Sequence, residues 1–296
     1  LPGSTLPPGL TGATKSLVDT VGPPPGGCPS CPASWEGHLG GGDFSPLTTG
    51  GTSVDDMRNA GAAQATLVIG ASLAPAADRL ASLTGVENHH FDHVMGQDAV
   101  DEFVATLVKI SGQPVPAKLL RQRAQLQDAM LDAHFMIGQA RVAIAADPDL
   151  LKTMSDLVVG LGAEVVAAVS TAGAKSLKTI PTEAVKVGDL EDLEHLATES
   201  NAELLIGNSH CVQSAGRLGV PLLRAGFPQF DVLGGFRKTW MGYAGTRDAY
   251  FDIANLMLST DKGEVEPYAS VYALRPQERE GDHVHSAASP SSGLRH

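Results

Sequence analysis

Residues 202–255 decide the fold, and they read AELLIGNSHCVQSAGRLGVPLLRAGFPQFDVLGGFRKTWMGYAGTRDAYFDIAN. Two short apolar runs, residues 204–206 and 220–223, lie on either side of a helical stretch. Apolar runs of this length around a helix are typical of a βαβ unit in a buried parallel sheet. Both runs end in polar or glycine residues, which we therefore expect at the carboxyl edge of the sheet, where open α/β sheets form their binding crevices.

Five residues at this predicted edge are candidates for an interface or a crevice: Asn208, Ser209, His210, Arg224 and Phe227. Asn208 or Ser209 is accounted for as an ordinary helix N-cap, but the same turn could instead hold an anion on its backbone N–H groups. Arg224 directly follows a buried strand, so its charge is either paired across a domain junction or directed into a crevice. No Ser-His-Asp triad or pair of carboxylates can be assembled here, so we assign no catalytic residue and expect a binding or scaffold role.

The alternation of strands and helices extends over most of the chain. Before residue 112 we expect short helices at 14–21 and 54–60, strands at 66–69 and 90–94, and helices at 74–83 and 97–111. Two prolines mark a joint, after which residues 117–138 predict one long helix with Leu119, Leu126, Met130 and Phe135 on its apolar side.

The alternation then restarts. Asp147 is placed to cap a helix over 149–161 with Pro148 at its first position. Further strands are expected at 141–145, 163–169 and 185–187, an acidic helix at 189–200 and a closing helix at 247–258.

This pattern predicts an α/β protein with two Rossmann-like, three-layer α/β/α domains built on parallel sheets, the first of them incomplete. We expect a partial domain with an irregular Gly/Pro-rich start over residues 1–115, a connector helix over 116–140, a C-terminal domain over 141–259 and a disordered tail over 260–296. The chain starts without Met and lacks the first strand of the first domain, so we expect a fragment in which residues 1–110 are less well ordered than residues 141–258.

Composition excludes several classes of function. The chain has 296 residues and a net charge of −12, which argues against a nucleic-acid partner because such binding depends on clustered Lys and Arg. It has no apolar run long enough to span a membrane and no signal peptide at its start. Three cysteines do not make a disulfide framework, so we expect a cytoplasmic location.

Two clusters of potential metal ligands need an explanation. Cys28 and Cys31 form a CxxC pair that could be half of a zinc or iron–sulfur site or a redox pair, yet only His38 is near enough in sequence to add a ligand. A cluster of His89, His90, Asp92 and His93 fits either a metal site or a polar strand end. We assign no metal ligand in either cluster.

Several long motifs resemble the nitrogenase component 1 family, and they occur in the family's order. They include RQRAQLQDAMLD at 121–132, VGDLEDLEHLA at 187–197, LIGNSH at 205–210, GVPLLRAGFPQFD at 219–231 and GYAGT at 242–246. The first, second and fourth look most like the branch of the family that assembles the iron–molybdenum cofactor. The resemblance covers about residues 37–258, whereas residues 1–36 match only loosely.

The resemblance implies most of the family's middle Rossmann-like domain and all of its last one. It implies a scaffold subunit that pairs with a NifE-like subunit in a heterotetramer, binds the nitrogenase iron protein transiently and holds an iron–molybdenum cofactor precursor during maturation. The intact complex would carry an iron–sulfur cluster, but no cofactor is expected on this chain alone, and Cys28, Cys31 and Cys211 inherit no ligand role. The alternative is a β-type subunit of a nitrogenase-like oxidoreductase, such as the molybdenum–iron protein or light-independent protochlorophyllide reductase.

Overall fold

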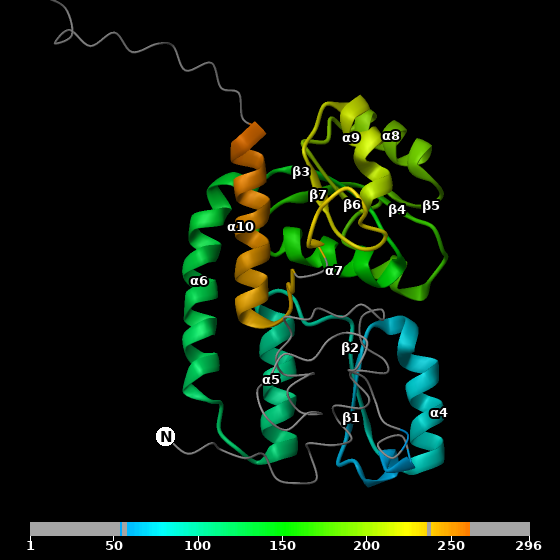
Figure 1. Ribbon diagram of the computed structural model, residues 1–296, viewed down its shortest axis with the longest axis vertical. Coiled ribbons are helices and arrows are strands. Elements are labelled where there is room, and N and C mark those ends of the chain that lie inside the picture. The colour runs from blue at the N-terminus through cyan, green and yellow to red at the C-terminus, as the bar shows by residue number, and fades with distance from the viewer. Residues whose placement is uncertain (1–53, 55–57, 236–237, 261–296) are drawn as a thin grey trace, which may run out of the picture. The chain divides into compact units, whose positions relative to one another are not determined.

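The computed structural model describes residue 54 and residues 58–235 and 238–260, which contain two parallel sheets (Figure 1). The smaller sheet pairs β1 (Thr66–Ile69) with β2 (Asn88–Phe91). The larger has five strands in the order β5-β4-β3-β6-β7. Its strands are β3 (Arg141–Ala145), β4 (Glu164–Ser170), β5 (Val185–Val187), β6 (Leu204–Gly207) and β7 (Leu222–Arg224).

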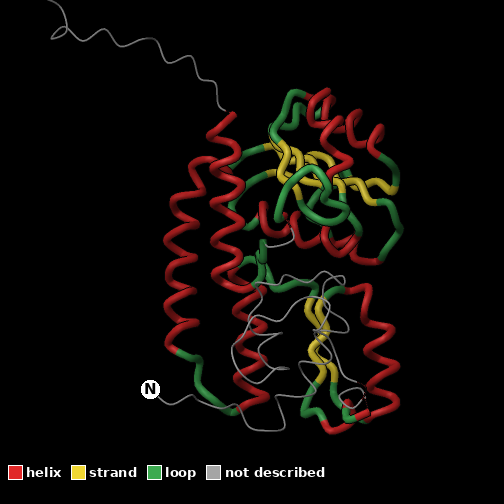
Figure 2. Tube along the Cα trace, in the orientation of Figure 1, coloured by secondary structure: helices red, strands yellow, loops and turns green. Residues whose placement is uncertain are grey.

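Helices cover both faces of the five-stranded sheet because successive side chains of a strand point to opposite faces. In β3, Val142 and Ile144 join one core cluster with α7 (Pro148–Val159), while Ala143 joins a second cluster with α8 (Leu190–Glu199) and α9 (Val212–Leu218). Figure 2 shows the strands lying between these helices. The parallel β6-α9-β7 unit predicted from residues 202–255 is confirmed.

Capping fixes where the helices of this sheet begin. The Asp147 carboxylate accepts the backbone N–H of Leu150 at 3.2 Å, and Pro148 occupies the first turn of α7, as predicted. Asp189 caps α8 and forms a capping box with Asp192. The strands expected at 141–145 and 185–187 are confirmed, and β4 is shifted by one residue from the expected 163–169.

The two-stranded sheet is followed by the amphipathic helix α5 (Gln97–Ser111). The elements η2 (Ala71–Leu73) and α4 (Ala74–Thr84) pack beside the strands, and η1 (Ala60–Ala62) packs against α4. The strand β1 and the helix α5 have the predicted bounds. The prediction of a strand at 90–94 is wrong in its bounds, since β2 begins two residues earlier and ends three residues earlier. Val94 leaves the sheet because its carbonyl accepts the backbone N–H of Gly242, and its side chain is buried in the core.

Two long helices, α6 (Ala117–Ile137) and α10 (Gly242–Thr260), pack side by side (Figure 1). Four residues of α6 form its buried stripe: Leu126, Ala129, Ala133 and Ile137. The prediction that Phe135 belongs to the apolar side is wrong, since Phe135 is 86% exposed. Two alanines in the stripe let α10 approach closely, and Phe135 lies on the other side of the helix. The closing helix also starts five residues before the expected Arg247, because Tyr243 and Thr246 are buried at its first turn.

Some predictions fall outside the described residues: the helix at 14–21, the Cys28–Cys31 pair and the tail after residue 260. The helix expected at 54–60 falls partly outside them, although Val54 and Arg58 are helical. Within the part of the chain that the structure describes, none of the helices combines the length and apolarity needed to cross a bilayer.

Candidate functional site

The five-stranded sheet has a topological switch point at its centre. From β3 the chain proceeds outward to β4 and β5 on one side of the sheet. It then returns to β6, on the other side of β3, and proceeds outward to β7. The loops after β3 and β6 therefore lead in opposite directions. In open parallel sheets such a point forms a crevice outside the carboxyl ends of the strands. Asn208 and Ser209 follow β6 directly, and Arg224 ends β7, its neighbour.

Ser209, Arg224 and Asp231 form a polar network at this edge. The Ser209 hydroxyl donates to the Asp231 carboxylate and accepts the backbone N–H of Phe230 at 3.0 Å. Arg224 Nε donates to the other Asp231 oxygen at 2.7 Å. The hydrogen bond from Ser209, supported by Arg224 and opposed by burial, lowers the pKa of Asp231 below its usual value. Arg224 is thus paired locally, with a residue seven positions later in the same loop, and not across a domain junction as one of the two predictions had it.

Asn208 closes the turn that joins β6 to η4 (Ser209–Cys211). Its amide oxygen accepts the His210 N–H at 3.0 Å, and its amide nitrogen donates to the Phe227 carbonyl at 2.9 Å. The Ser209 N–H donates to the Pro228 carbonyl at 3.0 Å. The N-cap interpretation of Asn208 is therefore confirmed, and these two N–H groups are not offered to an anion.

The outer side of the loop after β7 is apolar. Phe227, Phe230 and Leu233 are 54%, 68% and 103% exposed. The His210 ring packs edge-on against Phe230 with ring centroids 5.5 Å apart. The structure thus brings all five predicted candidates to one edge, while the side-chain polar groups of Asn208, Ser209 and Arg224 are used inside the loop. Sequence reasoning missed Phe230 and Asp231, although both lie in the GFPQFD motif.

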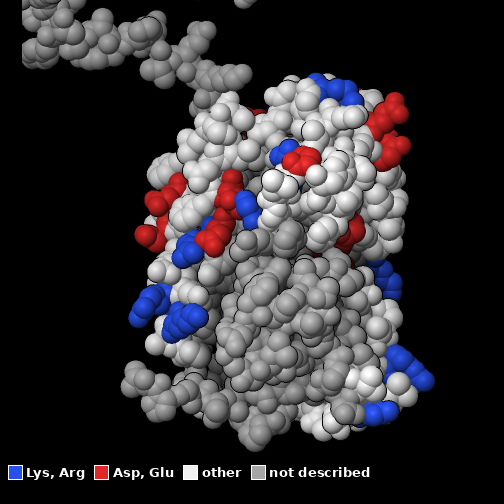
Figure 3. Space-filling model, viewed as in Figure 1, with Lys and Arg blue, Asp and Glu red and all other residues white. Residues whose placement is uncertain are grey.

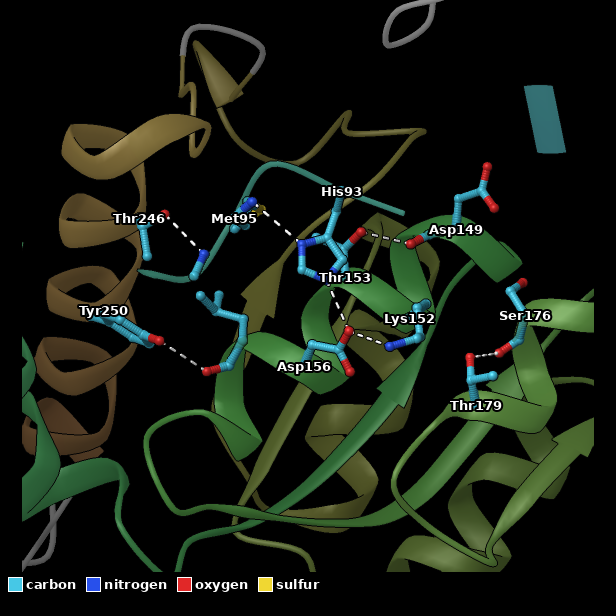
Figure 4. Close-up of polar contacts among 12 residues, drawn as sticks. His93, Met95, Asp149, Lys152, Thr153, Asp156, Ser176, Thr179, Thr246 and Tyr250 are labelled. Carbon is cyan, nitrogen blue, oxygen red and sulfur yellow. Dashed lines mark hydrogen bonds and ion pairs between the residues drawn. The ribbon is translucent and has the colours of Figure 1, made fainter. Parts of the chain in front are cut away.

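A second feature is a cavity of about 570 Å³ beside α7 and α10. Its lining includes the end of β2, the start of α5 and the side chains of His93, Asp156 and Tyr250. Figure 4 shows His93 and Lys152 both directed at Asp156. His93 Nε2 lies 2.9 Å from an Asp156 oxygen, and Lys152 donates to the same oxygen.

The lowered pKa of Asp156 predicts that the free energy of unfolding depends on pH in the acid range. Burial opposes its ionisation, but hydrogen bonds from His93 and Lys152 outweigh burial and lower the pKa below its ordinary value of 3.8. A lowered folded-state pKa stabilises the protein above the unfolded pKa, and this stabilisation is lost as pH falls through the folded pKa. We expect Asp156→Asn to cost about 1–2 kcal/mol at neutral pH, with the difference shrinking as pH falls below 3.8 toward the lowered folded-state pKa.

Urea unfolding at several pH values measures this difference. Glu87→Gln is the matched control. Glu87 is exposed, so this substitution also removes one negative charge but does not break a comparable set of contacts. A cost of Asp156→Asn that did not shrink at all as the pH was lowered below 3.8 would contradict the assignment.

The described residues do not fit a resident iron–sulfur cluster or other metal centre. The imidazoles near β2 diverge, since His93 pairs with Asp156 and His90 lies 3.7 Å from Asp78. No group of three or more His, Cys, Asp or Glu side chains in the described ranges could hold a metal. Cys211 is buried, and burial raises its thiol pKa to about 11, which disfavours the thiolate that binds iron.

The arrangement of parallel sheets agrees with the result of comparison with known protein families. The family model described as nitrogenase component 1 type oxidoreductase matches residues 1–258. This chain belongs to that family. The match to the nitrogenase component 1 family includes residues 1–36, where the motifs alone indicated only a loose resemblance.

Three curated relatives carry the name nitrogenase iron-molybdenum cofactor biosynthesis protein NifN. The protein from Bradyrhizobium diazoefficiens is 44% identical over 88% of this chain and 55% of its own length. The protein from Rhizobium meliloti is 43% identical over 88% of this chain and 58% of its own length. The protein from Klebsiella pneumoniae is 42% identical over 82% of this chain and 53% of its own length. The chain therefore spans about half the length of the curated relatives it matches.

A solved structure, "Nitrogenase Cp1 at pH 6.5", has the same fold with a TM-score of 0.70 and 29% identity. The alignment covers 79% of this chain and 54% of that one. A second structure, "Nitrogenase Cp1 at pH 5", is 12% identical and has a TM-score of 0.54. Its alignment covers 71% of this chain and 50% of that one, and this likeness bears on the fold alone. The predicted α/β fold class of this nitrogenase component 1 family member is confirmed.

Proposed function

We propose that this chain forms part of a scaffold subunit for biosynthesis of the nitrogenase iron–molybdenum cofactor, pairing with a NifE-like subunit in a heterotetramer. The observation that carries the proposal is the identity of 44% with a relative named NifN, against 29% with the nitrogenase structure. The precursor of the cofactor is the cargo of this complex, and the nitrogenase iron protein visits it transiently.

The geometry of the sheet edge supports a contact role for Asn208, Ser209, His210, Arg224 and Phe227. Their polar atoms hold the loop in one conformation, and the loop presents Phe227, Phe230 and Leu233 to the outside. Exposed aromatic and aliphatic side chains on a rigid base are typical of protein–protein contacts. We propose that this loop contacts the NifE-like subunit.

Since the described residues hold no metal site, we propose that the iron–sulfur cluster and the cofactor precursor of the complex are bound chiefly by other parts of it. We further propose that the two domains are bounded near residues 115 and 140, and that α6 connects them.

Affinity purification from a nitrogen-fixing bacterium that lacks its own NifN tests the pairing. The tagged 296-residue chain should retain the NifE-like subunit in near-equimolar amount by mass spectrometry. The full-length Bradyrhizobium diazoefficiens relative is the positive control. If the chain is folded by circular dichroism yet retains the α-type subunit of nitrogenase instead, the alternative of a β-type oxidoreductase subunit is favoured. Retention of neither subunit would overturn both.

The contact loop is tested in the same strain with Phe227→Ser combined with Phe230→Ser. Loss of two exposed anchors should reduce retention of the NifE-like subunit at least about tenfold. Leu83→Ser is the matched control, since Leu83 is 66% exposed on α4, outside this loop. If both variants retained the NifE-like subunit equally, the loop would not be part of the interface.

A further inference from the structure

The cavity beside α7 and α10 has an apolar floor. Phe91, Met95 and Tyr250 line it and are buried, and Met130 of α6, which also lines it, is partly buried against the same core. A volume of about 570 Å³ lies within the range of sites that enclose a side chain or a small molecule. The floor can therefore hold the aliphatic part of a ligand.

The rim of the same cavity is acidic. It consists of Asp92, which follows β2, and of Asp98 and Glu102 on α5, and all three residues are exposed. Among the ion pairs of the described residues, none involves these three carboxylates. Asp156, deeper in the cavity, is already paired with Lys152. Since the described residues that line the cavity include no Lys or Arg, the charge of the rim stays uncompensated.

This arrangement of charge is unfavourable for the chain alone. Carboxylates four residues apart on a helix repel one another, and the dipole of α5 favours Asp98 in its first turn more than Glu102 in the next. The two imidazoles of the lining, His90 and His93, already lie beside other carboxylates. The charge of Asp98 also reaches α10, where it adds to burial in raising the pKa of Tyr250 to about 12.

Opposite charges are mixed elsewhere on the surface. On the face shown in Figure 3, red and blue atoms lie next to one another at several places over the described residues. The cavity differs, because its rim carries charge of one sign only. A concave surface lined by one sign of charge concentrates ligands of the opposite sign, so the rim is complementary to a cation.

We propose that this cavity docks a Lys- or Arg-bearing segment of a partner protein. Lys and Arg side chains have an apolar stem that packs on the floor and a charged end that reaches the rim. A metal ion does not fit, because no three potential ligands of the described residues converge on one point. A polyamine carries charge along its whole length, which an apolar floor does not suit. The inference does not depend on the proposed scaffold role, because the cavity is separate from the loop after β7.

Fluorescence anisotropy tests this docking with the purified 296-residue chain and a labelled peptide, Gly-Leu-Arg-Leu-Lys-Leu-Gly. A matched neutral peptide has Gln in place of Arg and Lys. The basic peptide should bind at least about tenfold more tightly than the neutral one. Asp98→Asn combined with Glu102→Gln removes two charges of the rim and should raise the dissociation constant of the basic peptide about tenfold. Binding of the peptide should also slow amide hydrogen exchange at residues 95–102.

Glu183→Gln combined with Glu199→Gln is the control, because it removes the same charge from exposed positions outside the cavity. It should change the dissociation constant by less than about twofold, since salt screens distant surface charges. All four substituted positions are exposed, and thermal unfolding verifies that each variant is folded.

Three results would overturn the docking of a basic segment: equally tight binding of the neutral peptide, equal losses in the two double variants, or unchanged exchange at residues 95–102. Spermidine is the competitor that separates a free amine from a polypeptide. If it displaced the labelled peptide at a concentration equal to or lower than the unlabelled peptide, the site would belong to a small amine and the proposed partner would be wrong. None of these results would alter retention of a NifE-like subunit as evidence for the scaffold role.

Discussion

Replacing Tyr250 by alanine is expected to lower the free energy of unfolding by about 3–5 kcal/mol, as for other large aromatic residues in cores. Tyr250 is 1% exposed and belongs to the core cluster that includes α5, α6, α7 and α10. Its removal leaves a cavity that close-packed neighbours cannot fill. Urea unfolding followed by circular dichroism measures the loss.

The hydroxyl of Tyr250 has a separate and smaller role. It donates to the Leu157 carbonyl at 3.1 Å, in the last turn of α7, where carbonyl groups lack a partner within the helix (Figure 4). Tyr250→Phe keeps the ring and should cost only about 1 kcal/mol. The neighbouring Phe251→Ala, at a position 36% exposed, should cost less than about 1 kcal/mol. If Tyr250→Phe cost as much as Tyr250→Ala, packing would not be the main contribution.

The second large effect is expected at Asp101, which joins α5, α6 and α10. The single Nε–H of Arg123 is shared between the two Asp101 oxygens, at 2.9 and 3.0 Å, and Nη2 donates at 2.7 Å, while the Tyr243 hydroxyl donates at 2.6 Å. Hydrogen bonding from Arg123, with help from Tyr243, lowers the pKa of Asp101 although burial opposes it. Burial and the bond to Asp101 raise the pKa of Tyr243 to about 12.

Asp101→Ala leaves both donors without an acceptor and should cost about 2–3 kcal/mol at neutral pH, less than a fully buried pair would. The cost should shrink as pH falls below 3.8, because the stabilisation from a lowered pKa is complete above the unfolded value and is lost as pH falls through the folded-state pKa. A double-mutant cycle with Arg123→Ala should show about 1–2 kcal/mol of coupling.

The exposed neighbours Arg247 and Asp248 provide the control for Asp101. They form a pair at 2.7 Å with 31% and 56% side-chain exposure, so Asp248→Ala should cost less than about 0.5 kcal/mol. Additive costs of Asp101→Ala and Arg123→Ala would contradict a shared network.

Local rules predicted most of the fold because its elements follow from periodicity and capping. The helix α5 and the strands β1, β3 and β5 have the predicted bounds, and Asp147 caps α7 as its position before Pro148 indicated. The errors arose where a distant segment decides the outcome. Phe135 fits an apolar helix face by composition, but the position of α10 determines which face is buried.

The candidate site was predicted as a location but not as a set of contacts. Asn208, Ser209 and Arg224 come together because parallel strands end at one edge, which the sequence pattern indicates. The Ser209–Asp231 bond joins residues 22 apart, and the His93–Asp156 pair joins residues 63 apart. Spacing rules for helices and strands do not extend to such separations.

The contacts between α10 and residues 94–101, of which Val94, Met95 and Val100 are buried, have a consequence for synthesis of the chain. Gly242 and Thr246 hold this segment through Val94 and Gly96, and Tyr243 reaches Asp101 across 142 residues of sequence. At translation rates of 5–20 residues per second, roughly 7–28 s pass before the covering helix exists. During that interval the nascent chain presents apolar surface around Val94 and Met95, which is the kind of surface that chaperones bind.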